Sequence, residues 1–333
     1  MRKHFLIIGL GSIGKRHAMN LISLGHSVSV LHHRSIMPSS EIDIKAIYNS
    51  VREAFQETYD GVIVCTPTSL HLEYLKYSLQ QNVPVLLEKP ISHNFEQIEV
   101  LRKLIQDKQY QVMMGFNFRY HPQVQRIREM LRKKILGQLL YANIWWCDDL
   151  RTWYPQDRYL VNYASNSHLG GGALLTICHE IDLALWLFGE PLWVDAFIDN
   201  LTLPMKGVDD YFKGTIQFQD RPFCQIQQDF ITKLPDRGMR ITGETGSLKW
   251  DYFKGTLTWK LDGCELEEED LGPITPSLKN QTYIDEIQNF IDFIENKIAN
   301  PVPFEDGIKV QWLIEKFKEA HQKSSRVNVG EKL

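Results

Sequence analysis

Three glycines near the start of the chain have a spacing that brings the backbone close to a phosphate. Gly9, Gly11 and Gly14 follow an apolar run at residues 5–8 and open a helical pattern. In that context a Gly-x-Gly-x-x-Gly motif indicates a dinucleotide site, with the phosphates at the helix N-terminus. A glycine turn without a ligand is the alternative. We expect the dinucleotide to contact Gly9, Gly11, Ser12, Ile13 and Gly14.

The end of the second apolar run, at residues 28–31, distinguishes the two nicotinamide cofactors. An Asp or Glu there would bond the adenosine ribose hydroxyls of NAD, but the chain continues with His33, Arg34 and Ser35. Arg34 and Ser35 suit a 2′-phosphate, which no carboxylate at this point would repel. The sequence therefore predicts NADP(H) as the preferred cofactor and NAD(H) as the alternative. A solvated strand end is the competing explanation of Arg34.

Four further motifs follow in a characteristic order, at residues 65–71, 88–90, 170–182 and 241–246. With the glycine motif, they make the chain resemble, over nearly its whole length, the family of glucose–fructose oxidoreductase, inositol dehydrogenase and MocA. The resemblance implies a Rossmann domain followed by an α/β domain whose open sheet supports the substrate site and often the subunit interface. It also implies a homo-oligomer, which we expect to be a homodimer or homotetramer.

The resemblance places Lys89 where nicotinamide and substrate meet. Moving a hydride from a carbinol carbon requires a base that takes the hydroxyl proton near neutral pH, and a lysine can be tuned to that task. Lys89 precedes Pro90, which favours extended backbone at a strand end, where α/β sheets bind ligands. A surface lysine in water is the alternative. The motifs around it imply further cofactor contacts at Cys65, Thr66, Pro67, His71 and Glu88.

The second candidate catalytic residue is His179, early in an apolar helical stretch. A helical period places Thr176, His179, Leu183 and Trp186 along one face. A lone histidine there is usually structural, but its place in the family motif favours an acid/base or hydrogen-bonding group that contacts substrate. We expect no metal, because the eleven histidines show no H-x-x-x-H or Cys/His ligand spacing.

One departure from the family pattern concerns Thr176, which stands where many members carry an Asp. A threonine is not a general base at neutral pH. Lys89 and His179 suffice if Thr176 only hydrogen-bonds a substrate hydroxyl, which is the favoured reading. The alternatives are that Asp182 orients the histidine from the next turn, or that catalysis has been lost.

Residues 158–165 resemble a substrate-facing loop in members that act on amino-sugars or nucleotide-linked sugars. Arg158 suits a phosphate or carboxylate, and Asn162 and Tyr163 suit sugar hydroxyls; loop packing explains them equally well. Asn117 and Arg119, which follow the expected strand at 112–115, are also expected to face the cleft. The candidate substrate contacts are therefore Asn117, Arg119, Arg158, Asn162, Tyr163, Thr176 and His179.

Alternating strands and helices are expected to position these residues. Short apolar runs alternate with amphipathic helical patterns over residues 1–120, as in the βαβ units of a parallel sheet. The expected strands are 5–8, 28–31, 62–65, 83–87 and 112–115, and the expected helices are 17–24, 69–80 and 95–108. We therefore predict a Rossmann NAD(P)-binding domain at 1–120.

Residues 121–333 are predicted to form a substrate-binding and oligomerisation domain. A basic helix is expected at 122–134, with its charged residues on the solvent-exposed side of a packed helix. It precedes a Trp-rich strand and alternating strands between 208 and 261. These indicate an open, mostly antiparallel sheet. Residues 265–270 are read as an exposed loop. The chain closes with expected helices at 283–297 and 308–322.

Composition excludes several classes of protein. Across 333 residues, 37 Lys plus Arg against 41 Asp plus Glu give a net charge of −4, without the basic surplus that nucleic acid requires. The five cysteines are odd in number and scattered, which fits reduced thiols in a cytoplasm. No stretch approaches the roughly 20 apolar residues of a membrane helix, so we expect a cytoplasmic protein without a membrane or nucleic-acid partner.

The sequence thus predicts an α/β enzyme that interconverts a secondary alcohol and a ketone on a sugar, nucleotide-sugar or cyclitol ring by hydride transfer. A sensor or regulator that kept the cofactor site and lost catalysis is one alternative, suggested by Thr176. A reductase of a non-sugar substrate on the same fold is another.

Overall fold

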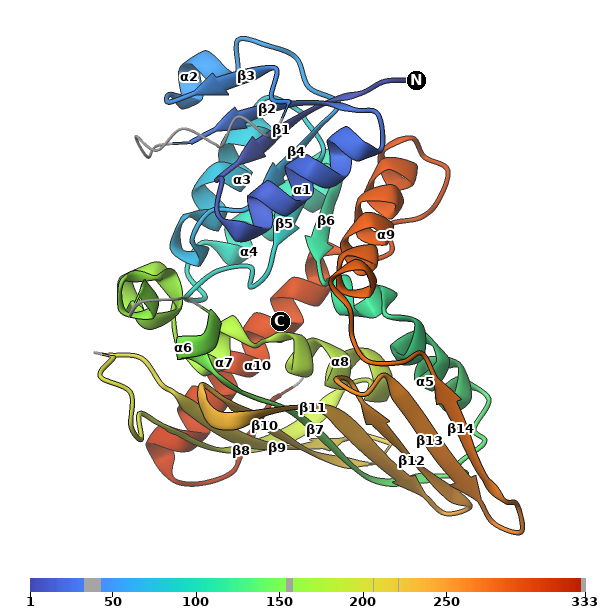
Figure 1. Ribbon diagram of the computed structural model, residues 1–333. Helices are drawn as coiled ribbons and strands as arrows, with labels where there is room; N and C mark the ends of the chain where they lie inside the picture. Colours follow the sequence, from blue (N-terminus) through green and yellow to red (C-terminus); the bar gives the residue numbers. More distant parts are fainter. Residues whose placement is uncertain (33–42, 154–157, 206, 221, 331–333) are drawn as a thin grey trace. The chain divides into compact units, whose positions relative to one another are not determined.

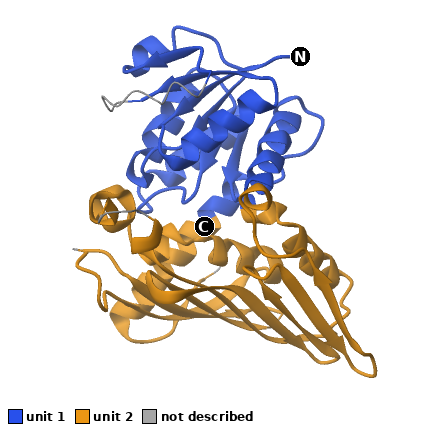
Figure 2. Cartoon of the chain, in the orientation of Figure 1, with its two compact units in different colours: residues 1–117, 280–308 blue, residues 118–279, 309–333 orange. Residues whose placement is uncertain are grey.

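The computed structural model describes residues 1–333 apart from 33–42, 154–157, 206, 221 and 331–333. The chain divides into two compact units, coloured separately in Figure 2. Unit 1 comprises Met1–Asn117 and Asn280–Ile308, and unit 2 comprises Phe118–Lys279 and Lys309–Leu333. The chain therefore leaves unit 1, returns to it, and ends in unit 2.

Unit 1 is built on a six-stranded parallel sheet with the order β3-β2-β1-β4-β5-β6. Its strands are β1 (His4–Ile8), β2 (Ser27–Leu31), β3 (Ala46–Tyr48), β4 (Gly61–Val64), β5 (Val85–Glu88) and β6 (Val112–Gly115). Strands β4, β5 and β6 are buried along their whole length, as in parallel sheets with helices on both faces. Because the strand order reverses between β1 and β4, their carboxyl ends border the crevice where such sheets bind ligands.

Helices cover the sheet of unit 1 (Figure 1). They are α1 (Ser12–Ser23), α2 (Val51–Ala54), α3 (His71–Gln80), α4 (Ile98–Lys108) and most of α9 (Pro276–Ile294). Although it comes from the far end of the sequence, α9 packs on the first strand, with the rings of Phe5 and Phe290 6.4 Å apart. Asn280 and Asn20 also exchange side-chain hydrogen bonds, which tie α9 to α1.

Unit 2 contains a nine-stranded sheet with the order β14-β13-β12-β11-β7-β10-β9-β8-β15. All its strand pairs are antiparallel except β7 with β10. The strands are β7 (Leu139–Asp149), β8 (Pro191–Asp199), β9 (Tyr211–Phe218), β10 (Phe223–Asp229), β11 (Ile231–Gly243), β12 (Gly246–Asp251), β13 (Thr256–Leu261), β14 (Leu266–Asp270) and β15 (Val327–Asn328). The expected Rossmann sheet and open, mostly antiparallel sheet are both confirmed.

Figure 1 shows α5, α7 and α8 along one face of this second sheet. The helices of unit 2 are α5 (Pro122–Arg132), α6 (Leu150–Trp153), α7 (Ala173–Thr176), α8 (His179–Phe188) and the later part of α10 (Phe304–Lys323). Along β9, Phe212, Ile216 and Phe218 are fully buried on the helical side, whereas the alternate residue Lys213 is exposed. This alternation is typical of a sheet with one covered face.

Three local expectations were wrong. Strand β3 was not expected, because three half-buried residues carry too short a pattern. Residues 266–270 form the edge strand β14 rather than a loop; a row of carboxylates hides the alternation and discourages further pairing at that edge. Thr176 and His179 do not share one helix, because the chain breaks at Ile177 and bends by 49° between α7 and α8.

No single helix among the described residues is long and apolar enough to cross a membrane. One bent pair, Ser167–Thr176 with His179–Phe188, satisfies the length and composition alone. Most of α8 is buried inside unit 2, so its apolar character is explained by the core of that unit.

Candidate functional site

The glycine motif forms the turn between β1 and α1. Gly9 has a φ of +95°, and a Cβ on it would lie 2.7 Å from the carbonyl oxygen of Cys65, so only glycine fits. A Cβ on Gly14 would lie 2.0 Å from the carbonyl oxygen of Gly9. Gly14 therefore lets α1 begin directly against the strand that precedes it, as the motif predicts.

The middle glycine faces open space. A Cβ on Gly11 would meet no atom within 4 Å, and both Gly11 and Ser12 are exposed. Gly11 is the N-cap of α1, and no side chain caps this end of the helix. The first amides of α1 are therefore available as hydrogen-bond donors. A pyrophosphate fits this arrangement of open backbone and helix N-terminus. His33, Arg34 and Ser35, predicted to select the cofactor, lie outside the described residues.

The loop after β4 and the turn after β5 are tied together by His71. Its Nδ1 lies 2.7 Å from the carbonyl oxygen of Pro90, and its Nε2 lies 2.9 Å from that of Thr66. Burial lowers the pKa of His71, and the hydrogen bonds to the two carbonyl oxygens act against that shift. Cys65, Thr66 and Pro67 are half-buried beside this link. His71 thus fixes the loops on which the cofactor contacts were predicted.

Lys89 follows the last residue of β5 and is half-buried. Its backbone N–H donates to the carboxylate of Glu88 at 3.2 Å, and that carboxylate accepts a 2.8 Å hydrogen bond from His17 Nε2. Glu88 therefore holds the main chain of Lys89 against α1. The lysine emerges at the same carboxyl edge of the sheet as the glycine turn, where a nicotinamide dinucleotide would lie.

A third buried group, Glu286 on α9, completes this neighbourhood. Donor or acceptor atoms of His17, Glu88 and Glu286 lie within 4.8 Å of one another. Burial pushes the pKa of Glu88 upward, but the hydrogen bond from His17 and nearby positive charges outweigh it and hold that pKa below its usual value. Burial, and then the charge of Glu88, raise the pKa of Glu286 well above its usual value. The pKa values of the two carboxyl groups are therefore shifted in opposite directions.

In unit 2, His179 is the first residue of α8 and is buried. Its ring packs against that of Phe118, with centroids 5.0 Å apart. Arg237 also packs on these aromatic rings. Its guanidinium carbon lies 3.5 Å from the centroid of the Phe118 ring and 3.9 Å from that of Trp146. Aromatic packing thus fixes the orientation of the candidate histidine.

Two buried ion pairs anchor the first turn of α8. Glu180 accepts from the Nε and Nη2 of Arg237 at 2.9 and 2.6 Å. Asp182 accepts from the Nε and Nη2 of Arg119 at 3.0 and 2.5 Å. Arg119, a predicted substrate contact, is therefore paired with the very aspartate that was considered as a partner for His179, and both are buried.

The glycine run before α7 packs tightly on the predicted substrate loop. A Cβ on Gly171 would lie 2.5 Å from the carbonyl oxygens of Tyr163 and Ala164, and the N–H of Gly172 donates to that of Ala164 at 2.8 Å. The first amides of α7 then donate to the backbone and side chain of Asp209. This places Tyr163 beside the short helix that ends in Thr176.

The other predicted substrate residues have varied surroundings. Arg158 is exposed and Asn162 is half-buried, with its side chain accepting from the N–H of Ala164 at 3.4 Å. Asn117 is buried in unit 1, where its amide donates to Thr282 Oγ1 at 2.8 Å. The contact of Asn117 explains its burial without a ligand, whereas Arg158 has a guanidinium exposed to solvent.

Sequence reasoning did not single out His17, Glu286 or Arg237. His17 lies three residues after Gly14 and carried a usable signal, because that offset keeps it on the buried side of α1. Glu286 and Arg237 carried no such signal in the sequence. Their roles depend on partners that are distant in the sequence, which local patterns do not reveal.

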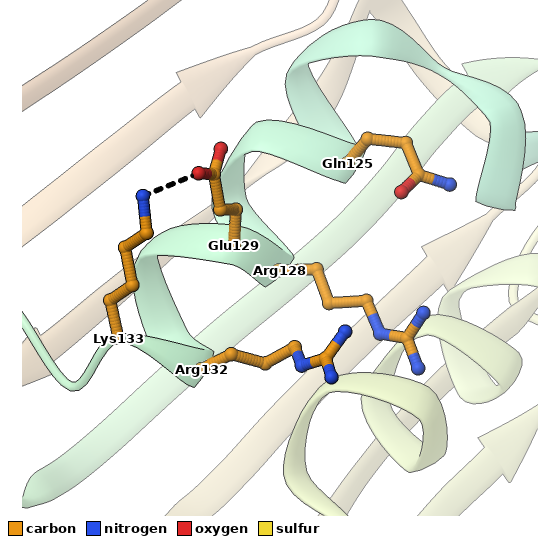
Figure 3. Close-up of a pocket in the computed structure, with 5 residues that line it drawn as sticks. All are labelled: Gln125, Arg128, Glu129, Arg132 and Lys133. Atoms are coloured by element: carbon orange, nitrogen blue, oxygen red, sulfur yellow. Dashed lines mark hydrogen bonds and ion pairs between the residues drawn. The ribbon is translucent and has the colours of Figure 1, made fainter.

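As predicted, the basic helix α5 packs on the core with one side and exposes the other side to solvent. It buries Val124, Ile127 and Met130. On its exposed side a surface pocket of about 290 Å³ is lined by Gln125, Arg128, Glu129, Arg132 and Lys133 (Figure 3). Lys133 pairs with Glu129 at 2.6 Å, so part of this positive charge is neutralised within the helix.

Fold and site together define a class of protein: a dinucleotide-binding Rossmann unit joined to an open-sheet unit, with a lysine at the cofactor edge. The family comparison agrees. The NAD-binding Rossmann-fold model of the oxidoreductase family matches residues 3–116, and the GFO/IDH/MocA C-terminal domain matches residues 124–249. The chain therefore belongs to the GFO/IDH/MocA family of oxidoreductases, which confirms the resemblance seen in its sequence.

Two curated relatives are similar along most of the chain. Glucose-6-phosphate 3-dehydrogenase of Bacillus subtilis is 23% identical, covering 97% of this chain and 98% of the relative. Inositol 2-dehydrogenase of Rhizobium meliloti is 26% identical, covering 92% of this chain and 93% of the relative. A solved levoglucosan dehydrogenase in complex with NADH has a TM-score of 0.87 at 19% identity and covers 100% of both chains, a likeness of fold.

Proposed function

We propose that the protein interconverts a secondary alcohol and a ketone on a sugar, nucleotide-sugar or cyclitol ring by hydride transfer with a nicotinamide cofactor. The observation that carries this proposal is the placement of Lys89 at the carboxyl end of β5, on the sheet edge that also carries the glycine turn. The names of the two relatives that align along nearly the whole chain, a sugar-phosphate and an inositol dehydrogenase, support the substrate class.

The bound nicotinamide would supply or accept the hydride. Backbone amides at the start of α1, beside Gly11, would hold its phosphates. In the direction of alcohol oxidation, the neutral amine of Lys89 takes the hydroxyl proton, and His179 is the second proposed acid/base or hydrogen-bonding group. In ketone reduction the ammonium of Lys89 returns that proton. Thr176 and Tyr163 hydrogen-bond other ring hydroxyls, and Arg158 takes a phosphate or carboxylate when the substrate carries one.

We favour NADP(H) over NAD(H) as the cofactor, because no carboxylate follows β2 and Arg34 and Ser35 suit a 2′-phosphate. The test is a titration of the purified protein with NADPH and NADH, following nicotinamide fluorescence. Tighter binding of NADPH, lost in Arg34→Glu, is the expected result. Tighter binding of NADH would reject the role of Arg34 and leave the reaction class intact.

The reaction class is tested by a turnover screen that follows nicotinamide absorbance with free sugars, sugar phosphates, nucleotide-sugars and cyclitols. Multiple turnovers with one of these classes are expected. Cofactor binding without turnover in any class would favour the sensor that Thr176 suggests, and turnover only with non-sugar ketones would replace the substrate class.

A second copy of the chain is the proposed partner on the open face of the second sheet. Cross-strand neighbours place Trp193, Phe223 and Tyr141 in one row of that face, and Phe197 with Trp145 in a parallel row. Phe197 and Phe223 are 48% and 41% exposed in the single chain. Such a band of aromatic side chains is typical of a subunit interface. The five cysteines are all free thiols, which supports a reducing, cytoplasmic location.

A further inference from the structure

Three ionisable side chains from three distant parts of the sequence meet inside unit 1. His17 comes from α1, Glu88 from the end of β5 and Glu286 from α9. His17 and Glu286 are 0% exposed and Glu88 is 7% exposed. One nitrogen or oxygen atom of each lies within 4.8 Å of those of the other two. We call these residues the buried triad.

Within the described residues, the triad is short of hydrogen-bond partners. His17 Nε2 bonds to Glu88, but neither oxygen of Glu286 nor Nδ1 of His17 has a hydrogen bond. An ionised carboxylate buried without partners is strongly destabilising. Two carboxylates this close in a medium of low dielectric cannot both be ionised. Either one of the two carboxyl groups is therefore protonated, or a cation lies between them.

A proton is the smallest charge that satisfies this requirement. A divalent metal bound by three side chains needs a water or substrate to complete its shell, whereas His17 and Glu286 are 0% exposed. A proton on Glu286 needs only one acceptor, and the carboxylate of Glu88 lies beside it. A neutral Glu286 donating to an ionised Glu88 also leaves His17 its own bond to Glu88.

We propose that Glu286 is a protonated carboxylic acid that donates to Glu88, and that the buried triad is a positioning device for Lys89. Glu88 is the residue before Lys89 and also accepts the backbone N–H of Lys89. His17 lies on the helix that begins at the glycine turn. The triad thus connects the helix that holds the cofactor phosphates to the turn that carries the lysine. The role for Lys89 rests on the proposed function, while the protonation of Glu286 does not.

Other ionisable groups face the triad, and their charges are consistent with a single negative charge at Glu88. Burial and the two carboxyl groups raise the pKa of the Cys65 thiol, so it is neutral. Burial lowers the pKa of His71. The ring of Tyr283 packs on His17 at 5.8 Å and on Arg16 at 4.7 Å. The ammonium of Lys89 favours the ionised form of Glu88.

The first experiment measures stability rather than activity. An acid whose pKa is higher in the folded than in the unfolded state loses stability as the pH rises above the unfolded value, here about 4.5. Glu286→Gln keeps the shape and donor of the protonated acid and cannot ionise. The Tm of Glu286→Gln minus that of the wild type should therefore grow by several degrees between about pH 5 and pH 8.

Asp285→Asn is the matched control, because it removes a carboxylate from the same helix at a half-buried position outside the triad. Its Tm difference from the wild type should not grow over the same range. A flat difference for Glu286→Gln would show that Glu286 is ionised in the folded protein and would overturn the proposal. One equivalent of tightly held metal in the wild type, absent from Glu286→Gln, would overturn it as well.

The second experiment tests the positioning role through the pH profile of kcat/KM for alcohol oxidation. Asp285→Asn, outside the triad, should keep the wild-type profile and kcat. Glu88→Gln removes the negative charge beside Lys89, so the acid limb of the profile should move to lower pH, with loss of kcat. A merely structural triad would lower the stability of Glu88→Gln without moving that limb.

The two hypotheses fail separately. If Lys89→Met retained full turnover, the catalytic role of the lysine would be lost, and the pH-dependent Tm difference of Glu286→Gln would still stand. If that difference were flat while Lys89→Met was inactive, the proposed reaction would stand without the proton on Glu286.

Discussion

At Lys89 the protein combines a long side chain with a fixed backbone. The main chain is held by the Glu88 carboxylate and, through the carbonyl oxygen of Pro90, by His71. A base that must reach a hydroxyl and retain the correct approach to the cofactor needs both properties. The chemistry at this site therefore depends on the buried groups behind the lysine as much as on its amine.

Lys89→Met is expected to lower kcat by about 10²- to 10⁴-fold, the usual range for loss of a general base. The methionine fills similar space, so the affinity for NADPH or NADH should be nearly unchanged. Steady-state kinetics and the fluorescence titration measure the two effects. Lys103→Met, an exposed lysine on α4, serves as the control and should behave as the wild type. Wild-type kcat in Lys89→Met would contradict the assignment.

The residues of the site were only partly predictable from the sequence. The glycine motif and Lys89 stand in short motifs whose local context already implies a strand end and a helix start. Two of the buried residues behind Lys89, His17 and Glu286, stand in no such motif and are 269 residues apart, the difference between 286 and 17. A sequence does not distinguish a glutamate that is buried and protonated from one that is exposed to solvent and ionised.

At the level of elements, α8 shows how an apolar helix can present a polar group. Its sequence is apolar enough to lie in a core, yet its first turn carries His179, Glu180 and Asp182. The two acids are neutralised by Arg237 and Arg119, which come from β11 and the turn before α5. Periodicity predicted the helix and its histidine but not the break after Thr176. The glycine run and Asp209, which is distant in the sequence, fix the start of α7.

Arg237→Met should destabilise the protein strongly, since it removes the guanidinium that neutralises the buried Glu180 carboxylate. Loss of one partner of a buried ion pair costs about 3–5 kcal/mol. The pair between Lys133 and Glu129 has the same 2.6 Å separation but is more than 40% exposed on both sides (Figure 3). Lys133→Met is therefore the matched control and should cost about 0–1 kcal/mol.

Urea unfolding of both variants measures these costs. The double variant Arg237→Met with Glu180→Gln should recover a large part of the lost stability, because it removes the uncompensated charge. Equal, small losses for Arg237→Met and Lys133→Met would mean that burial of the Arg237 pair does not set its contribution.

At the level of the whole molecule, the fold class followed from the order of patterns along the chain. Alternating strand and helix signals predicted the parallel sheet, and period-two alternation predicted the second sheet. That residues 280–308 belong to unit 1 was not visible, because the apolar face of α9 has the same period whichever unit covers it. Local patterns determine elements, while packing between distant residues determines where each element belongs.

The aromatic rows on the open face of the second sheet predict that the protein assembles into an oligomer. A monomer would leave the rows containing Phe197 and Phe223 in water, and burial of each aromatic ring contributes about 1.5–3 kcal/mol. The wild type should therefore sediment as a dimer or larger oligomer, and the double variant Phe197→Asp, Phe223→Asp should shift toward a folded monomer. Val100→Asp places the same charge at a 70% exposed apolar residue on α4 and should leave the mass unchanged. A wild type that sediments as one chain at micromolar concentration would assign the aromatic rows to some other partner and remove the second copy from the proposal.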